Sequence, residues 1–108
     1  LDRSPEEYYV SAPFKLPPGH HLCEVSWDVQ LPPQSWVRLQ LRAASTRAGL
    51  ARARWQGPEG EGSWWKNYQQ VRGMKGKWVQ YRLALGARQC GASPRVREVT
   101  IFYIETGV

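Results

Sequence analysis

The chain has 108 residues, the size of one domain, and six Trp, five Tyr and two Phe are too many aromatic residues for a disordered segment. No stretch approaches the roughly 18 apolar residues of a membrane-spanning helix, so we expect no membrane partner. The net charge of +6 favours acidic partners, such as acidic glycans or nucleic acid.

The first part of the chain predicts three strands. Residues 7–16 are a candidate edge strand, because Pro13 interrupts them. Residues 21–31 alternate cleanly, which predicts a half-buried antiparallel strand whose inward side chains are His21, Cys23, Val25, Trp27, Val29 and Leu31. Residues 35–44 alternate again. A Pro-Pro sequence separates the last two runs, so we expect them to form a hairpin.

The second part of the chain predicts further strands. Residues 50–56 favour a short strand by alternation, although their propensity also suits a helical turn. Residues 57–62 predict a Gly-rich turn. Residues 77–85 and 95–105 predict two more strands, and we expect the last to be central or covered because both its faces are partly apolar. Six to eight short strands predict an all-β fold, a jelly-roll-like antiparallel β-sandwich forming one module over residues 1–108.

The sequence contains two cysteines, Cys23 and Cys90. A disulfide between them would close a long loop and add about 3–4 kcal/mol in the entropic model. The alternative is one buried and one exposed thiol, and spacing does not decide between them. His21 and Cys23 would share a strand face, but no further ligand lies near them in the sequence. We therefore predict no metal ion and no cofactor.

The distribution of charge weakens an enzymatic function. Residues 29–58 contain five Arg and residues 62–97 contain eight basic residues, and neither stretch contains a carboxylate. Glu24 and Asp28 are the best carboxylate pair, but an extended strand separates their Cα atoms by about 13 Å, whereas the carboxyl groups of glycosidases lie about 5–9.5 Å apart. Signatures of a nucleophile elbow or a phosphate loop are also absent from the sequence. We predict that the protein is not an enzyme.

Aromatic and basic side chains predict a binding function instead. An exposed indole matches the C–H face of a sugar ring, and neighbouring Arg and Gln side chains donate hydrogen bonds to hydroxyl or carboxylate groups. Alternation places Trp36 and Trp78 on outward strand faces. Trp64 and Trp65 are consecutive in a loop, so at least one of them is expected to be exposed. The candidate ligand-binding residues are Trp36, Arg38, Trp64, Trp65, Tyr68, Trp78, Gln80 and Arg82.

A structural role is the alternative for each of these Trp residues. The indoles would then cap the open ends of the sandwich, or another segment would cover the outward strand faces. Trp27 and Trp55 are assigned to the core, because alternation points both of them inward.

Three segments carry a resemblance to a known kind of module: Ala-Arg-Trp-Gln-Gly-Pro-Glu-Gly at 53–60, Lys-Trp-Val-Gln-Tyr-Arg-Leu at 77–83, and Ser-Pro-Arg-Val-Arg-Glu-Val-Thr-Ile at 93–101. They resemble β-sandwich accessory modules of large secreted bacterial proteins, including polysaccharide-degrading enzymes. In those modules a W-x-G-P-x-G turn precedes a QYR-x-x-L strand, and a P-x-x-x-x-V-T-I strand closes the domain. The resemblance covers most of residues 22–103.

That resemblance implies a secreted, extracellular module of carbohydrate-binding type, with an attached catalytic domain in the parent chain. It carries over no particular binding residue, because the matching positions look structural. Such sandwiches can hold a structural calcium ion, but no acidic cluster in this chain predicts one.

We therefore expect a non-catalytic module that binds a polysaccharide, neutral or acidic, and so concentrates an attached enzyme on it. The alternative is a structural or protein-interaction spacer whose outward Trp residues dock on a neighbouring domain. The same aromatic plates and cations would suit single-stranded nucleic acid. The sequence lacks an RNA-recognition signature and a basic helix, however, so nucleic acid is the least favoured partner.

Overall fold

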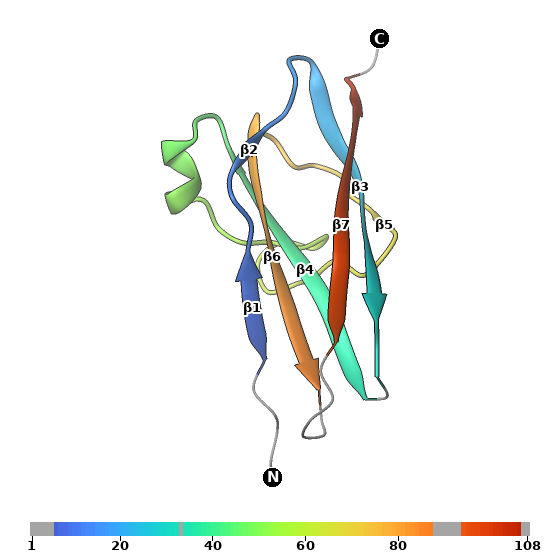
Figure 1. Ribbon diagram of the computed structural model, residues 1–108. Coiled ribbons are helices and arrows are strands. Elements are labelled where there is room, and N and C mark those ends of the chain that lie inside the picture. Colours follow the sequence, from blue (N-terminus) through green and yellow to red (C-terminus); the bar gives the residue numbers. More distant parts are fainter. Residues whose placement is uncertain (1–5, 33, 88–93, 107–108) are drawn as a thin grey trace.

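The computed structural model describes residues 6–32, 34–87 and 94–106, which form seven strands and one short 3-10 helix, η1 (Figure 1). The strands are β1 (Glu7–Val10), β2 (Phe14–Lys15), β3 (His20–Gln30), β4 (Ser35–Ala44), β5 (Gln69–Gln70), β6 (Trp78–Ala87) and β7 (Arg95–Glu105), and η1 spans Ala48–Arg52. The prediction of an all-β antiparallel sandwich is confirmed. The interrupted first strand is also confirmed, since β1 and β2 lie on either side of Pro13.

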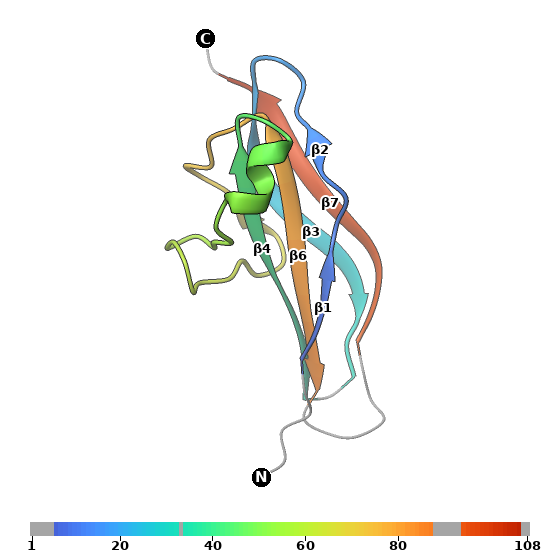
Figure 2. The ribbon, with the colours of Figure 1, turned by 90° about the vertical axis from the view of Figure 1, so that its left-hand side faces the viewer.

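The strands form two antiparallel sheets. In sheet A, β6 pairs with β4 on one side and with β1 and β2 on the other. In sheet B, β3 lies between β5 and β7. Both views show η1 against sheet A, on the side away from β3 and β7 (Figures 1 and 2). Sheet A therefore has an inner face toward sheet B and an outer face toward η1.

The predicted hairpin of residues 21–31 and 35–44 is wrong. Their strands, β3 and β4, lie in different sheets, with β3 paired to β7 and β4 paired to β6. Alternation shows which side of a strand is buried but not which strand lies beside it. Here the apolar sides of β3 and β4 face each other across the sandwich, and the Pro-rich connection carries the chain from one sheet to the other.

The core lies between the two sheets. Its buried members, each at most 3% exposed, come from β3, β4 and β6, from the loop before β5 and from the residues that follow β2 and β5: Leu16, Leu22, Val25, Trp27, Leu39, Leu41, Trp65, Val71, Val79 and Leu83. The assignment of Trp27 to the core is confirmed. Burying one such aliphatic or aromatic side chain contributes about 1.5–3 kcal/mol, so these residues are the main source of stability.

The inward face of β3 differs from the prediction at its start. Leu22 is buried, whereas His21 and Cys23 are only half-buried. The pairing with β7 shifts register between Leu22 and Glu24, so Cys23 is the extra residue of a β-bulge. The bulge moves the inward side from even to odd positions and removes the predicted shared face of His21 and Cys23. Cys23 is a free, half-buried thiol, which favours the alternative without a disulfide, and Cys90 lies outside the described residues.

The predicted strand over 50–56 is wrong: η1 covers its first three residues, in line with the alternative of a helical turn, and only Gln56 pairs with a strand, through an isolated bridge to Leu41. Ala and Arg favour helical backbone, and η1 needs only one apolar anchor, Leu50, which is buried. The hydroxyl of Thr46 accepts a hydrogen bond from the Gly49 amide at 3.0 Å and satisfies a free donor of the first turn. The alternating Ala residues bury too little surface to hold a strand in place.

The last strand is an edge strand, not a central or covered one. Among the described strands, β7 pairs only with β3. Val99 and Ile101 pack on the core, but Phe102, Tyr103 and Ile104 are about half exposed. Sheet A does not cover this end of β7, which explains why apolar residues on both of its faces did not indicate burial.

Candidate functional site: the outer face of sheet A

The loop between η1 and β5 is fixed to the outer edge of β4. Backbone hydrogen bonds join Leu39 to Trp65 and Leu41 to Gln56 in both directions, at 2.7–3.1 Å. Between these two anchors the chain folds back on itself at the predicted Gly-rich turn. A β-carbon on Gly57 would overlap the backbone of Ser63, so glycine is required where the two arms of the turn touch.

This anchoring decides where the loop indoles point. Trp65 extends into the core, where 1% of its surface is exposed, and its Nε1 donates to the Gln70 carbonyl at 3.1 Å. Trp64, the preceding residue, lies on the outer face of sheet A, against Arg38. Trp55 also lies on the outer face, half-buried against Arg42, so its assignment to the core is wrong. An extended segment at a sheet edge sends successive side chains to opposite faces.

The outer face of sheet A carries alternating guanidinium groups and aromatic rings, which we call the arginine–aromatic face: Tyr8, Trp36, Arg38, Arg42, Trp55, Trp64 and Arg82. The Arg38 guanidinium lies 4.3 Å from the centroid of Trp64, and that of Arg42 lies 4.4 Å from Trp55. Arg82 lies between the two rings, 5.4 Å from Trp64 and 5.0 Å from Trp55. These distances are those of cation–π contacts.

One carboxylate, that of Glu6, closes the N-terminal end of this face. It accepts hydrogen bonds from Trp36 Nε1 at 2.7 Å, from Arg38 Nη2 at 3.1 Å and from the Tyr8 hydroxyl at 3.1 Å. Burial is the largest influence on the Glu6 pKa and raises it. The three hydrogen bonds and the charge of Arg38 together outweigh burial, so the pKa of Glu6 is lowered.

The Trp36 indole packs closely against β6 because its partner there is glycine. Trp36 pairs with Gly86, and a β-carbon at that position would overlap the indole ring. The close approach brings Nε1 within reach of Glu6. Trp36 is thus half-buried and oriented, with its polar edge toward the acid.

Two glutamines hold the remaining arginines of the face. The side-chain oxygen of Gln80 accepts a hydrogen bond from Arg42 Nε at 2.9 Å, and that of Gln40 accepts one from Arg82. The two amide nitrogens donate to the carbonyls of Ser11 and Ser63, at 2.8 and 2.9 Å. Glutamine orients a guanidinium without neutralising it. Burial, and then the charge of Arg82, lowers the pKa of Arg42, which still remains protonated.

The structure brings four of the eight predicted site residues together. Trp36, Arg38, Trp64 and Arg82 come from β4, the loop before β5 and β6, and all lie on the arginine–aromatic face. Gln80 lies on the same face but is buried, and its amide accepts a hydrogen bond from Arg42 and donates one to Ser11. It therefore positions Arg42.

The other three predicted residues lie apart from this face. Trp65 is in the core and offers no surface to a ligand. Trp78 is half-buried at the far end of β6, with Arg47 5.9 Å from its ring. Tyr68 is 72% exposed in the loop before β5, with a positive φ of 63°. The preceding Asn67 fixes that loop through two 2.8 Å hydrogen bonds to the backbone of Trp27 in sheet B.

The sequence analysis missed four members of the site: Glu6, Tyr8, Arg42 and Trp55. Arg42 continues the outward run of β4, so alternation alone could have added it. Tyr8 and Glu6 are far from β4 in sequence, and only the pairing of β1 with β6 brings them to the face. That pairing could not be read from a single chain without knowing the strand order.

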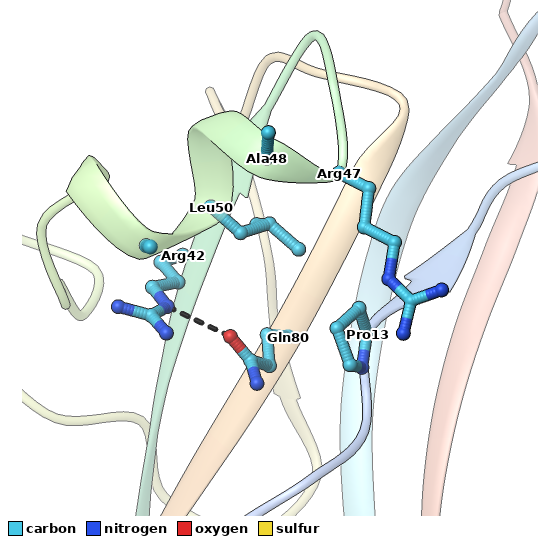
Figure 3. Close-up of a pocket in the computed structure, with 7 residues that line it drawn as sticks. Pro13, Arg42, Arg47, Ala48, Leu50 and Gln80 are labelled. Carbon is cyan, nitrogen blue, oxygen red and sulfur yellow. Dashed lines mark hydrogen bonds between the residues drawn. The ribbon is translucent and has the colours of Figure 1, made fainter.

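A groove lies beside the arginine–aromatic face, between η1, β6 and the segment that precedes β2 (Figure 3). Its volume is about 560 Å³. The lining residues are Pro13, Arg42, Arg47, Ala48, Leu50, Ala51 and Gln80. Arg42 is therefore shared between the groove and the face.

Neither a metal-binding cluster nor a membrane-spanning helix is found in the part of the chain that the structure describes. There, no three His, Cys, Asp or Glu side chains gather as a metal site would require. The described residues also include no helix long and apolar enough to cross a membrane. The prediction of no metal ion and no cofactor stays a prediction.

The chain matches no protein-family model, no curated protein and no solved structure. The resemblance to accessory modules of polysaccharide-active proteins therefore rests on the sequence motifs alone. Only the fold it implies, a β-sandwich, is present in the structure.

Proposed function

We propose that the protein is a non-catalytic carbohydrate-binding module that binds a polysaccharide on the arginine–aromatic face and concentrates an attached enzyme there. One observation carries the proposal. Trp36, Arg38, Trp64 and Arg82, from three separate segments, converge on one sheet face and touch each other or a shared partner. Flat rings beside oriented donors are what a sugar ring and its hydroxyl groups require.

The burial of the face supports a binding role over a core role. Trp36, Trp64, Arg38 and Arg82 are all half-buried, so they are held in place and still reach the surface. Rigid side chains lose little conformational entropy on binding, which favours affinity. The rings of Trp64 and Trp55 lie beside guanidinium groups, so a glycan bound there meets aromatic surface and N–H donors together.

A titration with a glycan panel tests this proposal. The panel holds β-glucan, xylan, mannan, pectin, alginate and a sulfated glycan, together with single-stranded DNA. Binding is followed by intrinsic Trp fluorescence and by retardation in affinity gels. We expect retardation by one class of glycan together with a change in Trp emission. Absence of binding to every glycan would contradict the proposal, and equal binding of all polyanions would show only the effect of net charge.

A second candidate function, a protein-interaction module, is favoured by one observation on sheet B. The end of β7 exposes Phe102, Tyr103 and Ile104, and the outer edge of this strand has no partner among the described strands. Exposed apolar edge strands are typical docking sites. If docking is the function, the isolated chain should bind an apolar dye at this strip, Phe102→Lys should abolish that signal, and no glycan should bind.

A further inference from the structure

The groove beside the arginine–aromatic face combines two cations with an apolar wall. Arg42 and Arg47 line it from β4 and from the residue that precedes η1, and none of its lining residues is acidic. Pro13, Leu50 and two alanines form the rest of its wall together with Gln80. Figure 3 shows the two guanidinium groups on opposite sides of Leu50 and Gln80.

The fixed arginine of the groove has a neutral partner. Arg42 Nε donates to the amide oxygen of Gln80 at 2.9 Å, so its direction is set while its charge is left uncompensated. The other end of the face shows the contrast, because Arg38 lies 3.1 Å from the carboxylate of Glu6. Arg38 therefore already forms an ion pair with a carboxylate of the chain itself. At the groove end, no carboxylate among the described residues forms an ion pair with Arg42.

We infer that the groove binds the carboxylate or sulfate group of an acidic sugar, which makes the ligand of the proposed module an acidic polysaccharide. This inference rests on the proposed carbohydrate-binding function. Arg42 and Arg47 each offer guanidinium N–H groups at the groove, and an anionic group bound there accepts charge-assisted hydrogen bonds with the planar geometry that guanidinium groups favour.

The shape of the groove fits a sugar residue that bears such a group. A volume of about 560 Å³ lies within the usual range of small-molecule sites, about 300–1,000 Å³. Pro13, Ala48 and Ala51, which are at least partly exposed, offer apolar surface to the C–H face of the ring, while the cations bind its acidic substituent. Because Arg42 also touches Trp55, a chain bound in the groove continues directly onto the arginine–aromatic face.

Calorimetric titration of four proteins tests the inference: the natural sequence, Arg47→Gln, Arg52→Gln and Trp64→Ala. Arg52 is exposed at the end of η1 but does not line the groove, so Arg52→Gln removes the same charge from the opposite end of this short helix. The probes are an oligogalacturonate, a sulfated dextran, a neutral xylo-oligosaccharide and single-stranded DNA. The first two distinguish a carboxylate from a sulfate ligand.

We expect Arg47→Gln to weaken binding of one acidic glycan at least fivefold and Arg52→Gln to weaken it less than twofold. Equal losses in the two variants would overturn the inference, because only net charge would then matter. The neutral oligosaccharide could instead bind as tightly as the acidic probes and lose this binding in Trp64→Ala. That result would overturn the groove as a site for an acidic sugar, while supporting the proposed function. No glycan binding at all would overturn both, and DNA binding equal to glycan binding would overturn the acidic-sugar specificity.

Discussion

The two exposed aromatic regions of this protein differ in how their side chains are held. On sheet A, the rings of the arginine–aromatic face lie between guanidinium groups that are themselves fixed by Glu6, Gln40 and Gln80. On sheet B, the end of β7 exposes Phe102 and Ile104. Both regions carry apolar surface, but only the first one presents oriented donors beside it.

This difference separates a surface built for a polar ligand from one suited to another apolar surface. A sugar needs hydrogen bonds to its hydroxyl groups, and a polar group left without a partner costs about 1–3 kcal/mol. The β7 strip would leave those hydroxyl groups unpaired. The comparison therefore favours sheet A over sheet B as the location of the proposed glycan site, and each of the following substitutions tests one side of this comparison.

The largest expected change in binding is the loss of glycan affinity in Trp64→Ala. This change removes the ring that Arg38 and Arg82 contact, so we expect at least a tenfold loss of affinity, about 1.4 kcal/mol. Phe102→Ala on β7 is the matched control and should bind as the natural sequence does. Affinity gels measure both, with thermal unfolding to show that each variant is folded. A loss in Phe102→Ala equal to that in Trp64→Ala would remove the distinction between the two regions.

The next effect is on the unfolding free energy and concerns the packing of Trp36 against Gly86. Gly86→Ala places a β-carbon where the indole lies, and such overpacking costs about 1–3 kcal/mol. Urea unfolding measures this cost. In a Trp36→Ala background the added methyl group meets no ring, so the same Gly86→Ala change should cost less than about 0.5 kcal/mol. Equal costs in both backgrounds would show that Gly86 is required by the backbone and not by Trp36.

A smaller effect is expected for the central cation of the face. Arg82 contacts Trp55, Trp64 and Tyr8, at 5.0–5.4 Å from their ring centroids. Each half-exposed cation–π contact is worth about 0.5–1 kcal/mol, so we expect Arg82→Gln to lower the unfolding free energy by about 1–2 kcal/mol. Arg97→Gln, exposed on β7, should change it by less than about 0.5 kcal/mol. Similar values for both would mean that the face is not a connected network.

The sequence was informative where local patterns determine the structure. Alternation located β3, β4, β6 and β7 to within two residues, because a half-buried strand leaves a period of two. It failed at Cys23, where one extra residue in a bulge inverts the pattern. It also failed at η1, where only Leu50 carries a burial signal. In these places the backbone responds to partners that a single segment does not reveal.

The candidate site shows the same limit. Trp36, Arg38 and Arg82 could be predicted because each lies on the outward side of a long strand. Trp64 and Trp65 could not be told apart from sequence, since only the hydrogen bonds between Leu39 and Trp65 fix which ring points inward. The hydrogen bonds from Arg42 to Gln80 and from Arg82 to Gln40 could not be predicted either, because each joins residues about forty positions apart.

The smallest expected effect is the pH dependence of Glu6. Its pKa is lowered in the folded protein, so the ionised carboxylate stabilises the fold, and that contribution is complete above the ordinary Glu value of about 4.3. It is lost as the pH falls through the lowered pKa. Glu6→Gln should therefore be less stable than the natural sequence at pH 7, and the difference should shrink as the pH falls through about 4 and below.

Urea unfolding at pH 7, 5, 4 and 3 measures this difference. Glu105→Gln on β7 removes an equal charge from sheet B, and we expect it to change the unfolding free energy at pH 7 by less than about 0.5 kcal/mol. A difference for Glu6→Gln that stays constant across the pH range would mean that Glu6 acts through its shape alone. Glu6 would then not serve as the counter-charge of Arg38, and the contrast between an occupied and an open end of the arginine–aromatic face would lose its electrostatic basis.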